Sequence, residues 1–270
     1  MRPSPRGPDG GTSLLELLVA LFVGSLLLLV MAVLFVRTQG LYRSISGSDS
    51  ALRQLRKART ALEKDLILSR PGDVRRAQVP DSLGGGGQDG EALWFLSPVD
   101  PATGEMMRKQ DGRAFWQRNI LYYLVVPADH DSTFGMICTG GRGPNNCDDR
   151  CPHKVLIRKV IDSGPPTVPT DEATEETLIT DITAYLTRPS GYSLAAMAEP
   201  GLTEATIVAA QLLTFESLSA PAPNNIAPEV FVDLRAVSIE GARRELRVGS
   251  DSLYTGRFTQ TAPFSVFLRN

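Results

Sequence analysis

Apolar side chains form one unbroken run near the start of the chain. Residues 17–36 contain no charged side chain. About 20 consecutive apolar residues are enough for one helix to cross the hydrocarbon core of a bilayer. The run is longer than the apolar part of a secretory signal peptide, and no A-x-A-like cleavage site follows it. The pattern therefore predicts a transmembrane helical segment over residues 12–36.

After residue 36 the chain becomes polar, and apolar residues repeat every three or four positions. This spacing is typical of one face of a helix, and Pro71-Gly72 ends the repeat. It predicts an amphipathic half of the same helix over residues 37–70. Such a face suits a coiled-coil partner or a sheet, and we favour a sheet because the rest of the chain supplies strands. The face consists of Leu41, Ile45, Leu52, Leu55, Leu62 and Leu66, with small Ser48 and Ala58 or Ala61 between them.

The remaining two hundred or so residues carry strand signals separated by polar loops. Residues 71–90 are expected to form a loop, because two prolines and the Gly84–Gly87 run disfavour regular structure. Short apolar or alternating runs predict strands that pair antiparallel. These runs cover residues 92–96, 115–126, 155–161 and 230–239, with further strand candidates at 178–186, 243–248 and 263–268. Residues 201–215 suit a short helix or a buried strand equally. The predicted fold class is α+β, with a long N-terminal helix packed against an antiparallel β-sheet domain over residues 71–270.

Composition limits the classes of partner. The 270 residues have a net charge of −2, so the chain lacks the broad basic field that nucleic-acid binding requires. The chain contains two histidines, His130 and His153, and no G-x-S-x-G, HExxH or Walker-type motif. We therefore expect no catalytic residues, no enzyme activity and no cofactor. Trp94 and Trp116 are interpreted as core or rim residues.

Three cysteines lie close together in the sequence, at Cys138, Cys147 and Cys151. In an oxidising compartment the leading interpretation is a disulfide, and three choices of pair stay open. Closing a loop of about ten to fifteen residues would stabilise the fold by roughly 3 kcal/mol. The alternative is zinc held by three thiolates and His153 or His130, but the Cys-x-His spacing is tighter than usual. We therefore predict no metal.

One carboxylate, Glu16, lies at the edge of the apolar run. An ionisable group inside a membrane helix costs about 2.5–3.5 kcal/mol at the bilayer centre, and a buried carboxylate needs a partner or takes up a proton. Cleavage after Gly11 would create an α-amino group at Thr12, one helical turn away. A neighbouring chain shifted along the helix axis could then present its amine to Glu16. The alternative is a plain membrane anchor with a tolerated Glu.

The segment Gly11-Thr12-Ser13-Leu14-Leu15-Glu16 resembles the processing site of type IV prepilins and type II secretion pseudopilins. The resemblance implies removal of a leader peptide (residues 1–11) by a prepilin peptidase and N-methylation of Thr12. It also implies that Glu16 meets the amino terminus of a neighbouring subunit. Thr12 stands where Phe or Met is usual, and Val33 stands where many members carry a helix-kinking Pro.

The size of the domain and its insertions look most like a minor pilin of the PilW type. The resemblance implies a pilin-like fold, and a single-pass inner-membrane protein with a periplasmic domain that later enters the pilus. Implied partners are major and other minor pilins, the prepilin peptidase, the inner-membrane assembly machinery and a tip adhesin, in twitching motility and cell adhesion. One alternative is a J-type pseudopilin of a type II secretion system. Another is a membrane protein whose periplasmic domain binds a metal or ligand.

Overall fold

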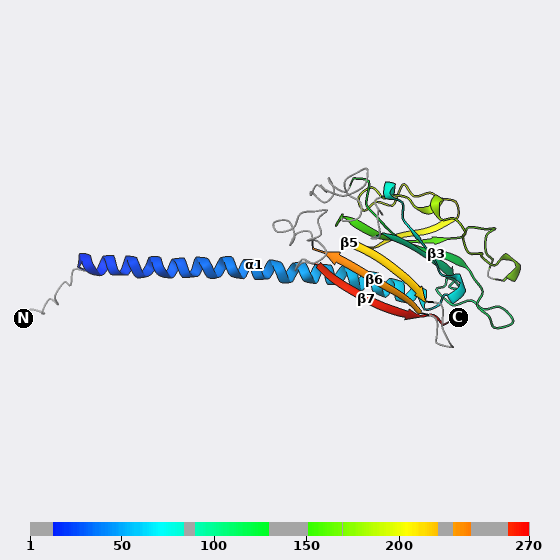
Figure 1. Ribbon diagram of the computed structural model, residues 1–270, viewed down its shortest axis with the longest axis horizontal. Helices are drawn as coiled ribbons and strands as arrows, with labels where there is room; N and C mark the ends of the chain where they lie inside the picture. The colour runs from blue at the N-terminus through cyan, green and yellow to red at the C-terminus, as the bar shows by residue number, and fades with distance from the viewer. Residues whose placement is uncertain are drawn as a thin grey trace, which may run out of the picture. The chain divides into compact units, whose positions relative to one another are not determined.

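The computed structural model describes residues 13–83, 90–129, 151–168, 170–220, 229–238 and 259–269. These residues form one long helix, α1 (Leu14–Leu66), followed by strands and short 3₁₀ turns (Figure 1). The strands are β1 (Arg75–Gln78), β2 (Glu91–Ser97), β3 (Arg118–Val125), β4 (Lys154–Ile161), β5 (Leu202–Ala220), β6 (Glu229–Val237) and β7 (Thr259–Phe267). The 3₁₀ turns are Pro71–Asp73, Asp81–Leu83, Glu172–Thr174 and Thr183–Tyr185. The α+β layout predicted from the sequence is confirmed.

The chain divides into two compact units, residues 1–45 and residues 46–270. The second unit contains the last turns of α1 and the whole sheet. The helix ends a few residues before the proline because Ser69 satisfies a terminal carbonyl. Its backbone N–H and its Oγ both donate to the Leu66 oxygen, at 2.9 and 2.8 Å, and Pro71 cannot continue the helix.

The seven strands of the described residues form one sheet in sequence order, and every neighbouring pair is antiparallel. Antiparallel neighbours can be joined by short turns, but here long segments separate β3 from β4 and β4 from β5. The strand predictions at 92–96, 115–126, 155–161 and 230–239 correspond to β2, β3, β4 and β6. The apolar ending at 263–268 is paired with β6 as part of β7. The candidate at 243–248 lies outside the described residues.

The segment 201–215, for which a helix and a strand were both considered, belongs to β5. This strand has 19 residues and pairs with two neighbouring strands. Its first half pairs with β4 and its second half with β6. The strand bends near Gln211, which has φ 59°, and the register shifts between Leu212 and Thr214, as a β-bulge does. Gly201 precedes the strand with φ 72°, and a Cβ there would lie 1.9 Å from the Asp162 carbonyl oxygen. Glycine is required at this close approach.

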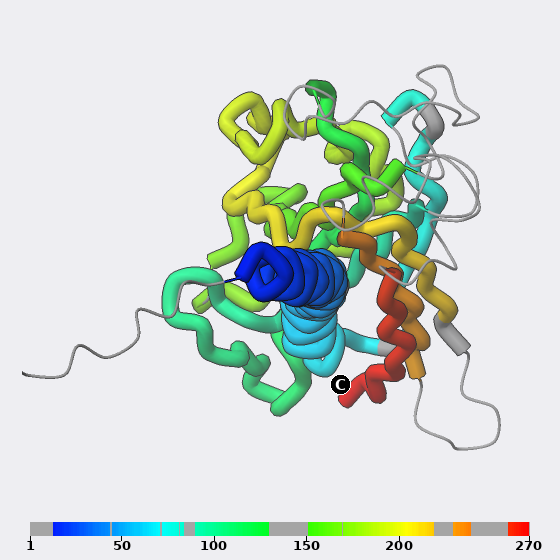
Figure 2. The backbone as a smooth tube through the Cα atoms, turned by 90° about the vertical axis from the view of Figure 1, so that its left-hand side faces the viewer, coloured from blue at the N-terminus to red at the C-terminus, as the bar shows by residue number. Residues whose placement is uncertain are grey.

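One face of the sheet packs on the end of α1. Buried helix residues recur at intervals of three or four, and they contact buried strand residues such as Phe95 and Tyr122. Figure 2 looks roughly along α1 and places its cyan last turns beside the strands. The expected sheet-packing face is confirmed at the end of the helix for Leu55, Ala58, Leu62 and Leu66, which are buried, whereas Leu52 is only partly buried and its neighbour Ala51 is buried instead. It is wrong for Leu41 and Ile45, whose side chains are 63% and 61% exposed.

The opposite face of the sheet is covered by an irregular segment between β4 and β5. Ile179, Ile182 and Tyr185 of this segment pack against Trp94 and Tyr123 of the sheet. Because helix and segment cover opposite faces, the central strands are buried on both sides. Nearly every residue of β2, β3 and β4 is buried accordingly, and β4 lacks a solvent face.

Two segments differ from the sequence prediction. Residues 178–186 form no strand: a 3₁₀ turn at Thr183–Tyr185 presents their apolar side chains to the sheet face instead of pairing at its edge. The expected loop at 71–90 contains β1, which pairs with β2 from Arg75↔Trp94 to Gln78↔Glu91. This strand is four residues long and mostly exposed, so it has no apolar alternation to reveal it.

Candidate functional site

The first part of α1 presents an uncovered apolar surface. Every large apolar side chain between Leu14 and Val36 is exposed. Among the described residues, α1 is the one helix long and apolar enough to cross a membrane. Apolar area left in water costs about 25 cal/mol per Å², so covering this surface with lipid or with other apolar segments would be favourable.

The predicted functional carboxylate lies at the start of this helix. Glu16 Oε2 accepts a hydrogen bond from the Ser13 backbone N–H at 3.0 Å, and Ser13 Oγ accepts from the Glu16 N–H at 3.3 Å. This reciprocal pair is a capping box, which satisfies two backbone donors that a helix start leaves without partners. Gly11 and Thr12 lie outside the described residues, so their predicted cleavage and methylation stay predictions.

The capping box gives Glu16 a role within its own chain, helix capping, that was not predicted from the sequence. The signal was present, because Ser-x-x-Glu before an apolar run is the sequence signature of this cap. Among the described residues only Oε2 of Glu16 carries a hydrogen bond. The cap therefore holds the carboxylate at the amino-terminal end of the helix and leaves Oε1 for a second donor. The expected contact with a neighbour's amine stays a prediction.

A partly buried polar contact fastens the end of α1 to the sheet. Asp65 Oδ2 accepts hydrogen bonds from the Tyr122 hydroxyl at 2.7 Å and from Arg158 Nε at 2.6 Å. Burial, reinforced by the negative charge of Asp65, raises the pKa of Tyr122 far above its usual value. The phenol therefore stays protonated and donates to the carboxylate. Helix, β3 and β4 meet at one ion-paired carboxylate.

A second buried network holds the irregular segment on the opposite sheet face. Lys159 Nζ is completely buried, and it donates to the Tyr185 carbonyl at 2.7 Å and to Thr187 Oγ1 at 2.8 Å. It also forms an ion pair with Glu199 and lies 5.2 Å from the centre of the Tyr123 ring. Burial lowers the pKa of Lys159, and the contact with Glu199 opposes that change. The lysine thus links β4 to two points of the segment.

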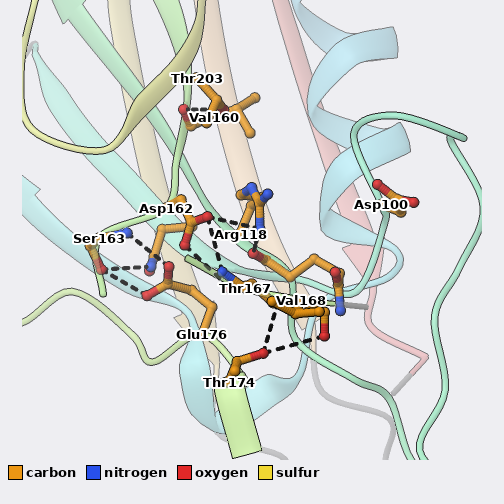
Figure 3. A network of polar contacts seen from close by, with 12 residues as sticks. Asp100, Arg118, Val160, Asp162, Ser163, Thr167, Val168, Thr174, Glu176 and Thr203 are labelled. Carbon is orange, nitrogen blue, oxygen red and sulfur yellow. Dashed lines mark hydrogen bonds and ion pairs between the residues drawn. The ribbon is translucent and has the colours of Figure 1, made fainter. Parts of the chain in front are cut away.

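A third network holds the loop after β4 (Figure 3). Asp162 lies between Arg118, at 3.3 Å, and Thr167, whose N–H and hydroxyl donate at 3.3 and 3.2 Å. Glu176 accepts from the N–H and the hydroxyl of Ser163, both at 2.8 Å. Burial raises the pKa of Glu176, and its hydrogen bond to Asp162 raises it further, while the Ser163 bonds lower it. Glu176 therefore keeps its proton to higher pH than an ordinary glutamate.

Replacing Glu176 with glutamine should make the protein relatively more stable as the pH rises. A raised folded-state pKa contributes stability that is present below the ordinary glutamate pKa and lost as pH rises through the folded value. Glutamine keeps a neutral donor for Asp162 at every pH. We expect the difference in free energy of unfolding, variant minus wild type, to increase as the pH rises above the ordinary glutamate pKa of about 4.3. Urea unfolding measures it, with Glu105→Gln at an exposed site as the control, and an equal slope in both variants would contradict the assignment.

The cysteine predictions reach only partly into the described residues. Cys151 is completely buried, and its Sγ accepts a hydrogen bond from the His153 N–H at 3.4 Å. Cys138, Cys147 and His130 lie outside the described residues, so the disulfide and the zinc alternative stay predictions. Within the described part of the chain, no group of three His, Cys, Asp or Glu side chains is arranged to hold a metal ion.

Comparison of the chain with protein-family models, with curated proteins and with solved structures finds no match. Function is therefore inferred from the residues and their geometry.

Proposed function

We propose that the protein is a minor pilin of the PilW-like type, with a pilin-like fold, that primes type IV pilus assembly and enters the filament. The observation that carries the proposal is the start of α1. A Gly11-to-Glu16 processing pattern overlaps the start of a helix whose large apolar side chains are all exposed between residues 14 and 36. In the inner membrane lipid covers this surface, and in a filament the helices of neighbouring subunits cover it.

The second half of the helix supports the same role. A subunit drawn from the membrane into a filament needs its soluble domain firmly attached to its helix. Here α1 contributes five of the fully buried core residues and the ion-paired Asp65. Truncating one buried leucine typically costs about 2–5 kcal/mol, so the attachment of residues 46–66 to the sheet is strong. The proposed action is assembly through helix packing, without covalent chemistry by this chain.

The proposed partners follow from the stages of this process. A prepilin peptidase removes the leader, major and other minor pilins surround the helix, and the inner-membrane assembly machinery moves the subunit. In the filament, Glu16 pairs with the amino terminus of a neighbouring subunit. An exposed Leu41–Ile45 surface, 63% and 61% exposed at these two residues, extends the helix contact beyond the membrane segment.

Glu16→Gln and Glu16→Ala separate the two roles of this carboxylate, which are capping its own helix and pairing with the amine of a neighbouring subunit. Glutamine at this position still completes a capping box but carries no charge. If Glu16 pairs with a neighbour's amine, both variants should insert into the membrane normally and enter filaments at least tenfold less, because such a charge-assisted contact is worth about 1.5–3 kcal/mol. Immunoblotting of sheared filaments and of membranes from a complemented deletion strain measures both quantities.

Ser13→Ala is the matched control, because it removes the other half of the cap and leaves the Glu16 charge. We expect it to assemble close to wild type. Normal incorporation of Glu16→Gln, with loss only in Glu16→Ala and Ser13→Ala, would show that the residue is a helix cap and would remove the assembly contact from the proposal.

A further inference from the structure

A basic pocket of about 380 Å³ lies beside the connection between β2 and β3. A hairpin turn forms one wall: the Gly112 N–H donates to the Lys109 oxygen, and the Lys109 N–H donates to the Arg113 oxygen, both at 2.9 Å. Gly112 has φ 84°, which glycine adopts without strain. The lining residues are Arg70, Arg108, Lys109, Gly112, Arg113, Ala114, Trp116 and Glu175.

The turn is held in place by residues 172–176 of the irregular segment between β4 and β5. Glu172 accepts from the Gln110 N–H at 2.6 Å. Glu175 forms an ion pair with Lys109 at 2.6 Å and accepts from the Trp116 N–H at 3.2 Å. The Glu176 N–H donates to the Trp116 oxygen at 3.0 Å. Contacts between segments about 60 residues apart therefore hold the 108–116 hairpin, which supplies most of the lining, in place.

Positive charge in this pocket exceeds negative charge. Four cationic side chains line it against one carboxylate, Glu175, which Lys109 already engages. Arg113 pairs with Asp111 at 3.1 Å, outside the lining. Among the described residues, the one carboxylate within ion-pair distance of Arg70 is that of Asp73. Its Oδ2 lies 3.9 Å from Arg70 Nε, which is long for an ion pair. The pocket therefore holds cationic groups that are weakly neutralised.

Arg108 is the cation best placed to bind a ligand. One of its terminal nitrogens, Nη1, donates to the Gly112 carbonyl at 2.9 Å, which orients the guanidinium in the wall of the turn. The other, Nη2, contacts the Met106 sulfur at 3.7 Å, a weak acceptor. No carboxylate among the described residues lies within ion-pair distance of Arg108. The planar guanidinium of this exposed arginine matches the paired oxygens of phosphate or sulfate.

We infer that this pocket binds a small ligand that carries a phosphate or sulfate on a sugar-sized ring. The arginines select the oxyanion, and Trp116 supplies an apolar wall for the ring. A volume of about 380 Å³ lies within the range of small-molecule sites and exceeds what a bare ion needs. The chain as a whole is slightly acidic, with a net charge of −2, so the cationic group is local. This site is independent of the filament role proposed above.

Isothermal titration of the full chain in detergent micelles tests the inference. Glucose 6-phosphate should bind at one site per chain, more tightly than inorganic phosphate or glucose, and more weakly as salt concentration rises. Arg108→Gln should weaken binding about 10- to 100-fold, the effect of losing one charge-assisted contact. Arg70→Gln, at a side chain that is 62% exposed, should weaken binding without disturbing the fold.

Arg56→Gln is the matched control, because Arg56 is exposed on α1 and does not line the pocket. It should bind glucose 6-phosphate like the wild type. Absence of saturable binding, equal affinity for inorganic phosphate and glucose 6-phosphate, or unchanged binding in both Arg108→Gln and Arg70→Gln would each overturn the inference.

Discussion

Replacing Lys159 with methionine should lower the free energy of unfolding by about 3–5 kcal/mol. The Lys159 side chain is completely buried, and that of its partner Glu199 is 6% exposed. Methionine fills a similar volume but leaves the carboxylate of Glu199 buried without its cation. The same change removes the donor to the Tyr185 carbonyl. An uncompensated charge in this position costs more than the packing that methionine restores.

Urea unfolding monitored by near-ultraviolet circular dichroism measures this effect, because Trp94 belongs to the same sheet face as the lysine's contacts. The double variant Lys159→Met/Glu199→Met should recover most of the lost stability, since both charges are then absent. Lys57→Met, at an exposed position of α1, should change stability by less than about 0.5 kcal/mol. A double variant no more stable than Lys159→Met would show that packing, and not the unpaired charge, causes the loss.

The long helix was predictable because its signal is repeated many times. The charge-free run from Leu17 to Val36 and the apolar repeat ending at Leu66 each involve many residues with the same spacing. The face of β6 was predictable for the same reason: Val230, Val232 and Leu234 alternate, and all are buried against the helix side. In these elements local periodicity and tertiary packing agree.

The parts that sequence did not reveal depend on contacts between distant residues. Lys159 interrupts the apolar positions of β4, and its partner Glu199 lies in an irregular segment 40 residues later. Nothing local indicates that the two side chains meet. Residues 178–186 are apolar enough for a strand, yet they cover a sheet face, since all positions beside the central strands are occupied. The basic pocket likewise combines Arg70, the 108–116 hairpin and Glu175.

Replacing Gly11 with valine should abolish removal of the leader and, with it, incorporation into filaments. Glycine lets the backbone at the scissile bond approach the peptidase closely, and a branched side chain prevents that approach. Without cleavage no α-amino group forms at Thr12, so the chain has no amine to present to a neighbouring subunit and keeps its leader at the start of the helix. Gly10→Val makes the same chemical change one residue earlier and should leave cleavage intact. Equal processing of the two variants would contradict a cleavage site at Gly11.

The mass of the wild-type chain, expressed with and without a prepilin peptidase, tests the central claim most directly. With the peptidase, intact-mass spectrometry should show loss of residues 1–11 and one added methyl group, and amino-terminal sequencing should begin at methylated Thr12. An unchanged mass, while a known prepilin in the same cells is fully processed, would contradict the proposal that this chain is a pilin-class subunit.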